Sequence, residues 1–373
     1  MREIFLMPTA RLRFSHSMSA SRSKKGYRCG IKSVINKFCI KLILSFRAFL
    51  VYWALCTYHN AMAEKLFITG SAGCIGHYLL DRFVDNPAYE LHLLLREKSR
   101  LKFDAKLFSN IIIHRCDMSD IETLADVLSE MDYVVHIATS WGDSEQVWIS
   151  NVDKTLALFA LCTRAKRIVY FSTASILGPG NLPIAAAGEF GSGYVRSKYK
   201  AYSLLPESPA YERIVTVFPT MVFGGDKTHP YSHISEGVVP NIRYLKWLRF
   251  FDVDVSFHFM HAVDLATMVE AMLFKPLDKK AYVLGHPVVT AREVFRTLGQ
   301  VFGVSIPFHI RITSQFVFML CKFFRIKLGT WEKYLIENPH FEYDVVRPED
   351  FGYVSALPTL KTLLVDIKEQ AGA

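Results

Sequence analysis

Two side chains one helical turn apart are the residues of this sequence best suited to proton transfer. Tyr194 and Lys198 lie four positions apart in the segment YVRSK, so a helix would place both on one face. A protonated Lys198 beside the phenol would lower the Tyr194 pKa from its usual value of about 10. Tyr194 could then exchange a proton with a substrate oxygen. The competing interpretation is a surface helix in which neither residue has a role.

A glycine-rich turn after an apolar strand is the second candidate site. In KLFITGSAGCIG, glycines stand at 70, 73 and 76. A strand, a tight turn and a helix direct free backbone N–H groups and the positive end of the helix dipole to one point, which suits a phosphate. Gly70 would permit the turn, Gly73 would let a pyrophosphate approach, and Gly76 would let the helix pack on the strand. A purely structural turn is the alternative.

These motifs together resemble the extended short-chain dehydrogenases/reductases of the NAD-dependent epimerase/dehydratase type. The family pattern Thr-Gly-x-x-Gly-x-x-Gly occurs here, followed by Tyr-x-x-x-Lys. In YFSTASILG, counting back from Gly178 places Thr173 where the family has the hydroxyl that hydrogen-bonds the reacting oxygen, with Ser172 and Ser175 as alternatives. The catalytic residues that the resemblance implies are Thr173, Tyr194 and Lys198.

Further segments match the family in chain order over roughly residues 65–302. In CDMSD, Asp117 and Met118 stand where the family contacts adenine, and in VVHIAT, Ala138 stands beside the cofactor. Asn151 is retained in the helix that follows. The cofactor-binding residues that the resemblance implies are Gly70, Gly73, Cys74, Ile75, Gly76, Arg96, Asp117, Met118, Ala138, Asn151, Tyr194, Lys198 and Pro219.

The end of the second strand bears on the choice between NAD and NADP. An acid there suits the ribose 2′-hydroxyl of NAD, whereas an arginine suits the 2′-phosphate of NADP. The sequence reads LLLREKSR, so Arg96 comes first, with Lys98 and Arg100 close by. This favours NADP, while Glu97 leaves NAD open. A solvated run of charges is the bland alternative.

The reaction that the resemblance implies is hydride transfer between nicotinamide and a carbonyl or secondary alcohol. Sugar dehydratases of the family carry an Asp-Glu pair directly after the threonine, but Ala174 and Ser175 stand here, which disfavours dehydration. A nucleotide-sugar epimerase with tightly bound NAD is a second hypothesis. A non-catalytic dinucleotide-binding assembly or sensor protein is a third, disfavoured because Thr173, Tyr194 and Lys198 are all present.

Strand and helix signals alternate along the body of the chain, which predicts an α/β doubly wound parallel sheet of the Rossmann type. We expect a nucleotide-binding domain over 62–219 and mainly a substrate-binding lobe over 220–373, with segments that return to the sheet. Strands are expected at 66–69, 91–95, 111–114, 133–137, 168–171 and 214–218, and helices at 74–84, 121–129, 147–165, 194–204, 263–274 and 291–302.

Two aromatic and basic stretches, 241–251 and 315–331, occur in the second lobe. They could line an apolar substrate pocket or rest on a membrane surface. The alternative is that they are helices packed on the core, with their lysines reaching outward.

The positive net charge of +9 comes from the first 61 residues, which hold eleven Lys and Arg against the single Glu3. The rest of the chain is close to neutral, which excludes nucleic-acid binding by its body. Residues 1–61 are interpreted as upstream sequence outside the native fold, a targeting segment, or a membrane anchor through the apolar run 38–58. Seven cysteines without a C-x-x-C pair indicate reduced thiols and no metal site. We expect a cytoplasmic protein with a small-molecule substrate, with organelle targeting or membrane association as alternatives, and a homodimer as in the family.

Overall fold

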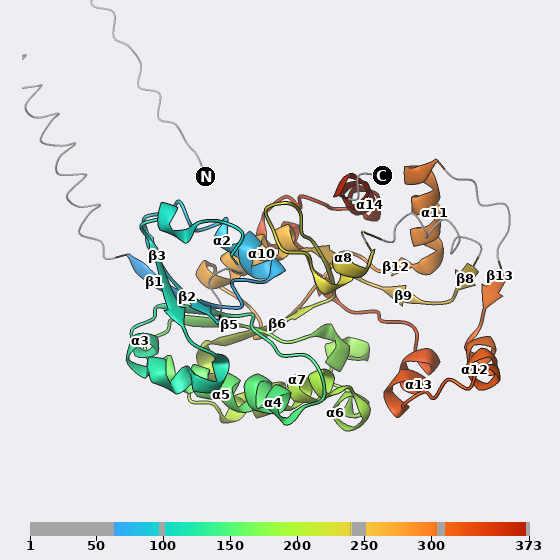
Figure 1. Ribbon diagram of the computed structural model, residues 1–373, viewed down its shortest axis with the longest axis horizontal. Coiled ribbons are helices and arrows are strands. Elements are labelled where there is room, and N and C mark those ends of the chain that lie inside the picture. Colours follow the sequence, from blue (N-terminus) through green and yellow to red (C-terminus); the bar gives the residue numbers. More distant parts are fainter. Residues whose placement is uncertain (1–62, 97–100, 239, 241–250, 304–309, 371–373) are drawn as a thin grey trace, which may run out of the picture. The chain divides into compact units, whose positions relative to one another are not determined.

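A parallel β-sheet of eight strands forms the centre of the protein (Figure 1). The computed structural model describes residues 63–96, 101–238, 240, 251–303 and 310–370. The strand order is β14-β11-β6-β5-β4-β1-β2-β3, and every neighbouring pair is parallel. The strands are β1 (Glu64–Thr69), β2 (Tyr89–Leu95), β3 (Ile111–Arg115), β4 (Tyr133–His136), β5 (Arg167–Phe171), β6 (Ile214–Pro219), β11 (Ala281–Leu284) and β14 (Val345–Val346).

Helices cover both faces of this sheet because its strands are apolar on both sides. Leu66 and Ile68 of β1 pack into one core with α2 and α10, whereas Phe67 packs into a second core with α5 and α7. Figure 1 shows α2 and α10 on one side of the sheet and α3, α4, α5 and α7 on the other. These helices are α2 (Cys74–Leu80), α3 (Ala125–Ser129), α4 (Glu145–Trp148), α5 (Lys154–Leu161), α7 (Gly193–Leu204) and α10 (Ala262–Phe274).

The strand order reverses direction at β1, which lies between β4 and β2. The connections from β1 and from β4 therefore leave toward opposite faces and open a crevice at the carboxyl ends of the strands. The glycine turn that follows β1 lies at this point. The sheet topology thus brings the turn to the place where doubly wound proteins bind their ligands.

Smaller elements surround this sheet, most of them from the second half of the chain. Two-stranded pairs join β10 to β7, β12 to β9 and β13 to β8. Among the described residues, no helix is both long and apolar enough to cross a membrane. The added elements are β7 (Met221–Phe223), β8 (Phe251–Val253), β9 (Ser256–Phe257), β10 (Phe259–His261), β12 (Val289–Thr290), β13 (Ile310–Ile312), α6 (Ala185–Phe190), α8 (His233–Val238), α11 (Ala291–Phe302), α12 (Ser314–Phe323), α13 (Thr330–Glu337) and α14 (Leu360–Gln370).

The predicted doubly wound parallel sheet is confirmed. The long helix predicted over 147–165 is wrong in detail, because a π-helical turn, η4 (Ile149–Asp153), separates α4 from α5, which ends at Leu161. Predictions for residues 1–61, for Glu97, Lys98 and Arg100, and for residues 241–250 lie outside the described residues.

Candidate active site

The three glycines of the turn after β1 differ in what surrounds them. Gly70 has a φ of +75°, and a Cβ there would lie 2.7 Å from the Ala138 nitrogen. A Cβ on Gly76 would lie 2.3 Å from the Gly70 carbonyl oxygen. At Gly73 the nearest atom, that same oxygen, would be 3.4 Å away, and its φ of −89° suits any residue. The fold itself requires Gly70 and Gly76, whereas the space at Gly73 remains open for a ligand.

The loop after β4 is tied to this turn by a buried hydrogen-bond chain. The Thr69 hydroxyl lies 2.8 Å from His136 Nδ1 and accepts a hydrogen bond from the Ala138 N–H at 3.1 Å. On its other side, His136 Nε2 lies 2.9 Å from the Thr155 hydroxyl. Burial holds the pKa of His136 well below its usual value, so the ring is neutral. This chain keeps Ala138 against Gly70 at the crevice.

Asn151 connects the same loop to the helix that carries the catalytic candidates. Its amide nitrogen donates to the Ser197 hydroxyl at 3.0 Å and to the Ser140 carbonyl at 2.9 Å. Its oxygen accepts from the Ser140 N–H and from the Thr139 hydroxyl. Protein groups thus satisfy the whole side chain, which lies within the π-helical turn Ile149–Asp153. Asn151 contributes to the site by holding these segments together.

Tyr194 lies in the first turn of α7, near the end of β5. Burial raises the pKa of Tyr194 to about 12, while the Thr173 hydroxyl, within hydrogen-bonding reach, acts to lower it. Thr173 is itself buried, and its oxygen also accepts a hydrogen bond from the Ser175 N–H at 3.3 Å. Thr173, the preferred sequence candidate, is therefore the hydroxyl that meets the phenol. Ser172 is also buried, and its hydroxyl has no hydrogen-bond partner among the described residues.

Lys198 is a buried cation for which the described residues provide no carboxylate. Its side chain is 1% exposed, its Nζ donates one hydrogen bond of 2.8 Å to the Phe171 carbonyl, and Nζ lies 5.0 Å from the Tyr170 ring centroid. Burial lowers the pKa of Lys198 to about 7. The expected lowering of the Tyr194 pKa by Lys198 is wrong here, because burial raises the pKa of the phenol and the group that acts to lower it is the Thr173 hydroxyl, not Lys198.

Trp141, which the sequence analysis missed, covers the Tyr194 ring. The two ring centroids are 3.9 Å apart with an interplanar angle of 19°, and Trp141 also meets His233 of α8 edge-on at 5.0 Å. Trp141 is nevertheless 56% exposed, so it presents apolar surface at the site. The available signal was a large aromatic residue three positions beyond Ala138, in a loop at the carboxyl edge of the sheet.

The nearby Asp143 fixes the start of the same helix. Its carboxylate accepts a short hydrogen bond from the Gly193 N–H and lies 3.9 Å from the Arg196 guanidinium. An acid at a helix N-terminus is favourable because it satisfies a free N–H group and faces the positive end of the dipole. Asp143 therefore positions the turn of α7 that contains Tyr194.

The predicted adenosine contacts lie together at the ends of β2 and β3. Arg96 Nε is 3.7 Å from the Asp117 carboxylate, and the Arg96 side chain is 66% exposed. Asp117 also accepts hydrogen bonds from the Ser119 N–H and hydroxyl. Met118 is buried in the core beneath them. The exposed Arg96 guanidinium can also contact an anion other than Asp117, and the exposed part of the Asp117 carboxylate can accept a hydrogen bond from a ligand.

The remaining predicted cofactor residues have mainly packing roles in the described structure. Cys74, the first residue of α2, is buried, and burial raises its pKa to about 12, so its thiol is unreactive. Ile75 packs against the core, and Pro219 is buried at the end of β6, opposite Leu284. The four cysteines among the described residues are free.

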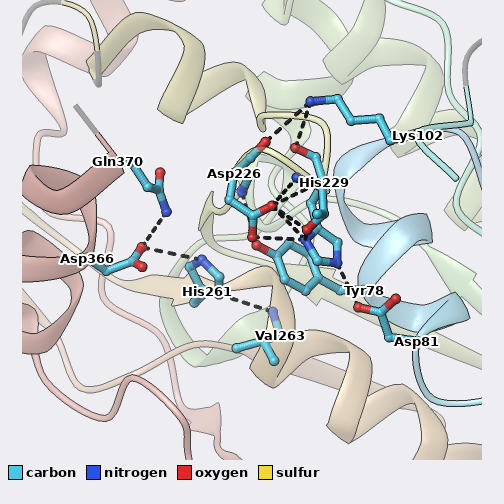
Figure 2. Close-up of polar contacts among 11 residues, drawn as sticks. Tyr78, Asp81, Lys102, Asp226, His229, His261, Val263, Asp366 and Gln370 are labelled. Atoms are coloured by element: carbon cyan, nitrogen blue, oxygen red, sulfur yellow. Dashed lines mark hydrogen bonds and ion pairs between the residues drawn. The ribbon is translucent and has the colours of Figure 1, made fainter. Parts of the chain in front are cut away.

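A polar cluster supports the far end of α2 (Figure 2). His229 stacks on Tyr78 with ring centroids 3.9 Å apart, and its two nitrogens lie 2.9 Å from Asp226 and 2.7 Å from Asp81. Lys102 Nζ donates to the Asp226 and His229 carbonyls. The cluster holds the helix whose first turn follows Gly73 against the loop after β7.

Two further groups complete this cluster. His261 Nε2 is buried and has no hydrogen-bond partner among the described residues, and it lies 3.8 Å from the Asp366 carboxylate of α14. Burial lowers the pKa of His261 to about 4, so it is neutral near pH 7. Asp366 also accepts a hydrogen bond of 2.7 Å from the Gln370 amide. Figure 2 shows Asp366 and Gln370 on the opposite side of His261 from Val263.

These residues fit a dinucleotide. The glycine turn leaves backbone space for a diphosphate, and Lys198 retains N–H groups for ligand oxygens because it has one protein acceptor among the described residues. Tyr194 and Thr173 bring a phenol and a hydroxyl together near Lys198 for proton transfer. In the part of the chain that the structure describes, no group of three or more His, Cys, Asp or Glu could hold a metal ion.

Comparison with protein families and curated proteins gives two results. A model of the NAD dependent epimerase/dehydratase family matches residues 66–285. A sterol-4-alpha-carboxylate 3-dehydrogenase (decarboxylating) of Dictyostelium discoideum is 23% identical over 106 residues, which cover 27% of this chain and 31% of that protein. The match thus spans about a third of the curated relative.

Solved structures share the fold over most of the chain. The enzyme WbmG of Bordetella bronchiseptica in complex with NAD has a TM-score of 0.59 at 15% identity, covering 84% of this chain and 96% of that one. A UDP-glucuronic acid 4-epimerase of Bacillus cereus, in complex with a UDP-sugar and NAD, has a TM-score of 0.60 at 17% identity, covering 83% and 99%. At these identities the likeness concerns the fold.

Proposed function

Because the chain belongs to the NAD dependent epimerase/dehydratase family, we propose that Thr173, Tyr194 and Lys198 catalyse hydride transfer between NAD(P) and a carbonyl or secondary alcohol. Members of this family are NAD-dependent enzymes of the extended short-chain type. What we propose here is which residues catalyse the reaction and what the reaction is. The observation that carries it is Lys198, a buried ammonium with no carboxylate among the described residues, in the same helix as a phenol that meets a hydroxyl.

Each side chain has a defined task in this reaction. When bound, NAD(P) supplies or accepts the hydride. With its pKa raised to about 12, Tyr194 holds its proton at neutral pH and donates it to a carbonyl oxygen in the direction of reduction. Thr173 donates a hydrogen bond that orients the same oxygen. Ligand oxygens that accept from Lys198 raise its pKa, and the ammonium then stabilises a Tyr194 phenolate in the reverse direction.

The proposal extends to NADP as the preferred dinucleotide. Arg96 is largely exposed and directly follows β2, where a guanidinium can pair with a 2′-phosphate. NAD is the alternative, because it is the nucleotide in the solved structures with this fold. Arg96→Ala should lower the ratio of NADPH to NADH affinity by about tenfold. The control is Lys200→Ala, which removes an exposed cation on α7 and should leave this ratio unchanged. If Arg96→Ala also left the ratio unchanged, NAD rather than NADP would be the preferred dinucleotide.

We further propose an apolar, ring-containing ketone or alcohol as the substrate. Trp141 presents exposed aromatic surface directly beside the Tyr194 ring, which favours a flat apolar partner. The short match to a sterol dehydrogenase is in line with this class. A UDP-sugar epimerase is the second candidate, since WbmG has also been solved with NAD and UDP. Ala174 and Ser175 after Thr173 speak against dehydration.

The test begins with the nucleotide that the purified full chain retains, identified by mass spectrometry. A reductase should exchange added NADPH or NADH freely and oxidise it with cyclic ketones, whereas an epimerase should keep NAD through dialysis and convert UDP-sugars. Tyr194→Phe should lower the detected turnover by roughly a thousandfold, since it removes the transferred proton. The matched control is Tyr202→Phe, which changes a half-buried tyrosine of the same helix and should leave the turnover unchanged.

Two results would contradict the proposal. Turnover that survives in Tyr194→Phe would remove this tyrosine from the chemistry. A folded chain that binds neither nicotinamide nucleotide, or binds one without any turnover, would favour the non-catalytic assembly or sensor protein.

A further inference from the structure

Large apolar side chains are exposed along α12 and just beyond it. No residue of α12 is buried. We call this surface the α12 face, made of five apolar and three basic residues. The apolar members, with their exposed fractions, are Phe316 (37%), Met319 (55%), Phe323 (78%), Phe324 (65%) and Ile326 (57%). The basic members are Lys322, Arg325 and Lys327. So many neighbouring apolar groups in water indicate a binding surface.

The backbone at the end of α12 keeps these side chains outward. Arg325 has a φ of +54°, in the left-handed region that non-glycine residues seldom adopt. The Ile326 N–H donates to the Cys321 carbonyl at 2.8 Å, which closes the helix end in the manner of a Schellman motif. Phe323, Phe324 and Ile326 are therefore held exposed by an ordered turn.

The charge of the α12 face points to an anionic partner. The sequence contains no Asp or Glu between Glu293 and Glu332. Lys322, Arg325 and Lys327 are all exposed, and none of the ion pairs among the described residues involves them. Alternating aromatic and basic residues suit the boundary between lipid headgroups and acyl chains, where the rings enter the apolar layer and the cations remain at the phosphates.

Other occupants fit this charge poorly. A second copy of the chain bound symmetrically through the same surface would bring the same three cations against one another. The chain's own apolar segment 38–58 carries Lys41 and Arg47 and no acid, so it too would add positive charge. We propose that the α12 face binds the surface of an anionic membrane, with Phe323, Phe324 and Ile326 in the interfacial layer. Figure 1 shows α12 at the edge of the described fold, beside α13 and away from α7.

The inference does not depend on the chemistry proposed for Tyr194 and Lys198. The test uses the full chain and flotation with vesicles of phosphatidylcholine containing about 30% phosphatidylserine. Phe323→Ser with Phe324→Ser should weaken binding at least tenfold, because two rings no longer enter the interface. The matched control is Leu107→Ser with Val354→Ser, two exposed apolar residues that do not belong to the α12 face, and it should bind as the unchanged chain does.

A charge variant separates the electrostatic contribution. Arg325→Glu with Lys327→Glu should weaken binding to the anionic vesicles at least tenfold and should change binding to pure phosphatidylcholine vesicles much less. Nucleotide affinity and circular dichroism should be unchanged in all variants, since none of these residues contacts the candidate active site.

Two outcomes would overturn the inference. The first is equal vesicle binding by the chain with and without the Phe323 and Phe324 substitutions. The second is a loss of self-association in sedimentation that is not accompanied by a loss of vesicle binding, which would assign the α12 face to a second copy.

Discussion

Lys198 and Asp226 are both ionisable groups removed at least in part from water, but their surroundings differ: Lys198 is fully buried with one hydrogen-bond acceptor among the described residues, whereas Asp226 accepts several hydrogen bonds. Burial acts to raise the Asp226 pKa, yet hydrogen bonds from Thr228 and His229 outweigh it and lower that pKa far below its usual value. Thr228 donates from its N–H and hydroxyl, and His229 from its N–H and Nδ1. Lys198 is buried more deeply and has one carbonyl acceptor among the described residues.

The different hydrogen bonding of Asp226 and Lys198 distinguishes a charge that supports the fold from a charge that serves a ligand. A charge that only supports the fold is stabilised by being satisfied within the protein, as Asp226 is. A charge kept for a ligand must retain free hydrogen-bonding capacity, and the unbound protein bears the cost of its desolvation. Lys198 fits the second description, because burial lowers its pKa and it keeps N–H groups without a protein acceptor among the described residues. Four substitutions test this contrast, and they follow in order of decreasing effect.

Lys198→Met should lower kcat/KM by roughly a thousandfold, because the ammonium that binds ligand oxygens and stabilises phenolate is lost. The same change should raise the free energy of unfolding at pH 6 by about 1 kcal/mol, since a buried charge is removed. Activity with any cofactor-dependent substrate and urea unfolding provide the two measurements. If Lys198→Met were inactive and also less stable than the unchanged protein at pH 6, Lys198 would be needed for the fold rather than kept for a ligand.

The pH dependence of the free energy of unfolding provides a second test with Lys198→Met. The folded pKa of Lys198, about 7, lies below its unfolded value of about 10.4, so the unfolded chain binds more protons between these pH values. The stability of the unchanged protein should therefore rise relative to Lys198→Met as the pH increases from 7 toward 10. A difference that stays constant with pH would contradict the lowered pKa.

Gly73→Ala should weaken NAD(P) binding by about ten- to a hundredfold while changing the free energy of unfolding by less than about 1 kcal/mol. The protein has room for the methyl group at this position, so the ligand alone should meet it. Gly237→Ala in α8, where a Cβ meets no atom within 4 Å, is the control and should bind normally. Calorimetric titration with both nucleotides measures the effect, and equal affinities would remove the diphosphate from this turn.

Asp226→Asn should lower the free energy of unfolding by about 1–2 kcal/mol near pH 7, because a neutral amide cannot accept all four hydrogen bonds and no longer pairs with His229. Asp104→Asn provides the comparison, since that carboxylate accepts a single backbone hydrogen bond at the start of a short 3₁₀ turn. In urea unfolding, the free energy of unfolding of Asp226→Asn should be well below that of Asp104→Asn. Equal stabilities would show that the number of donors is unimportant here.

Asp366→Asn should have the smallest effect, with a defined pH dependence. Burial, together with Glu369 and Asp226, raises the pKa of Asp366 to about 6, above its unfolded value of about 3.9. Its stabilising contribution is thus present below pH 4 and is lost as the pH rises to 6. The variant should match the unchanged protein at pH 4 and be more stable by about 1 kcal/mol at pH 7.5, as thermal unfolding would measure. A constant difference in Tm across this range would contradict the raised pKa.

The sequence by itself determined the features that depend on local periodicity and spacing. The alternation of apolar strands and helices predicts the parallel sheet, since each strand must bury both faces. The three-residue glycine spacing predicts the turn after β1. The helical turn between Tyr194 and Lys198 places both on α7. Each of these follows from neighbours within about a dozen residues.

Tertiary structure alone decided how the side chains behave once they are packed. The pKa of Lys198 falls because distant strands exclude water around it, and Trp141 reaches Tyr194 because the loop after β4 meets the start of α7. Asn151 hydrogen-bonds to Ser140 before it and Ser197 after it in the sequence, and the α12 face stays exposed because no other described element covers it. These properties depend on which remote groups are near and on how much water remains, and no local pattern in the sequence specifies either.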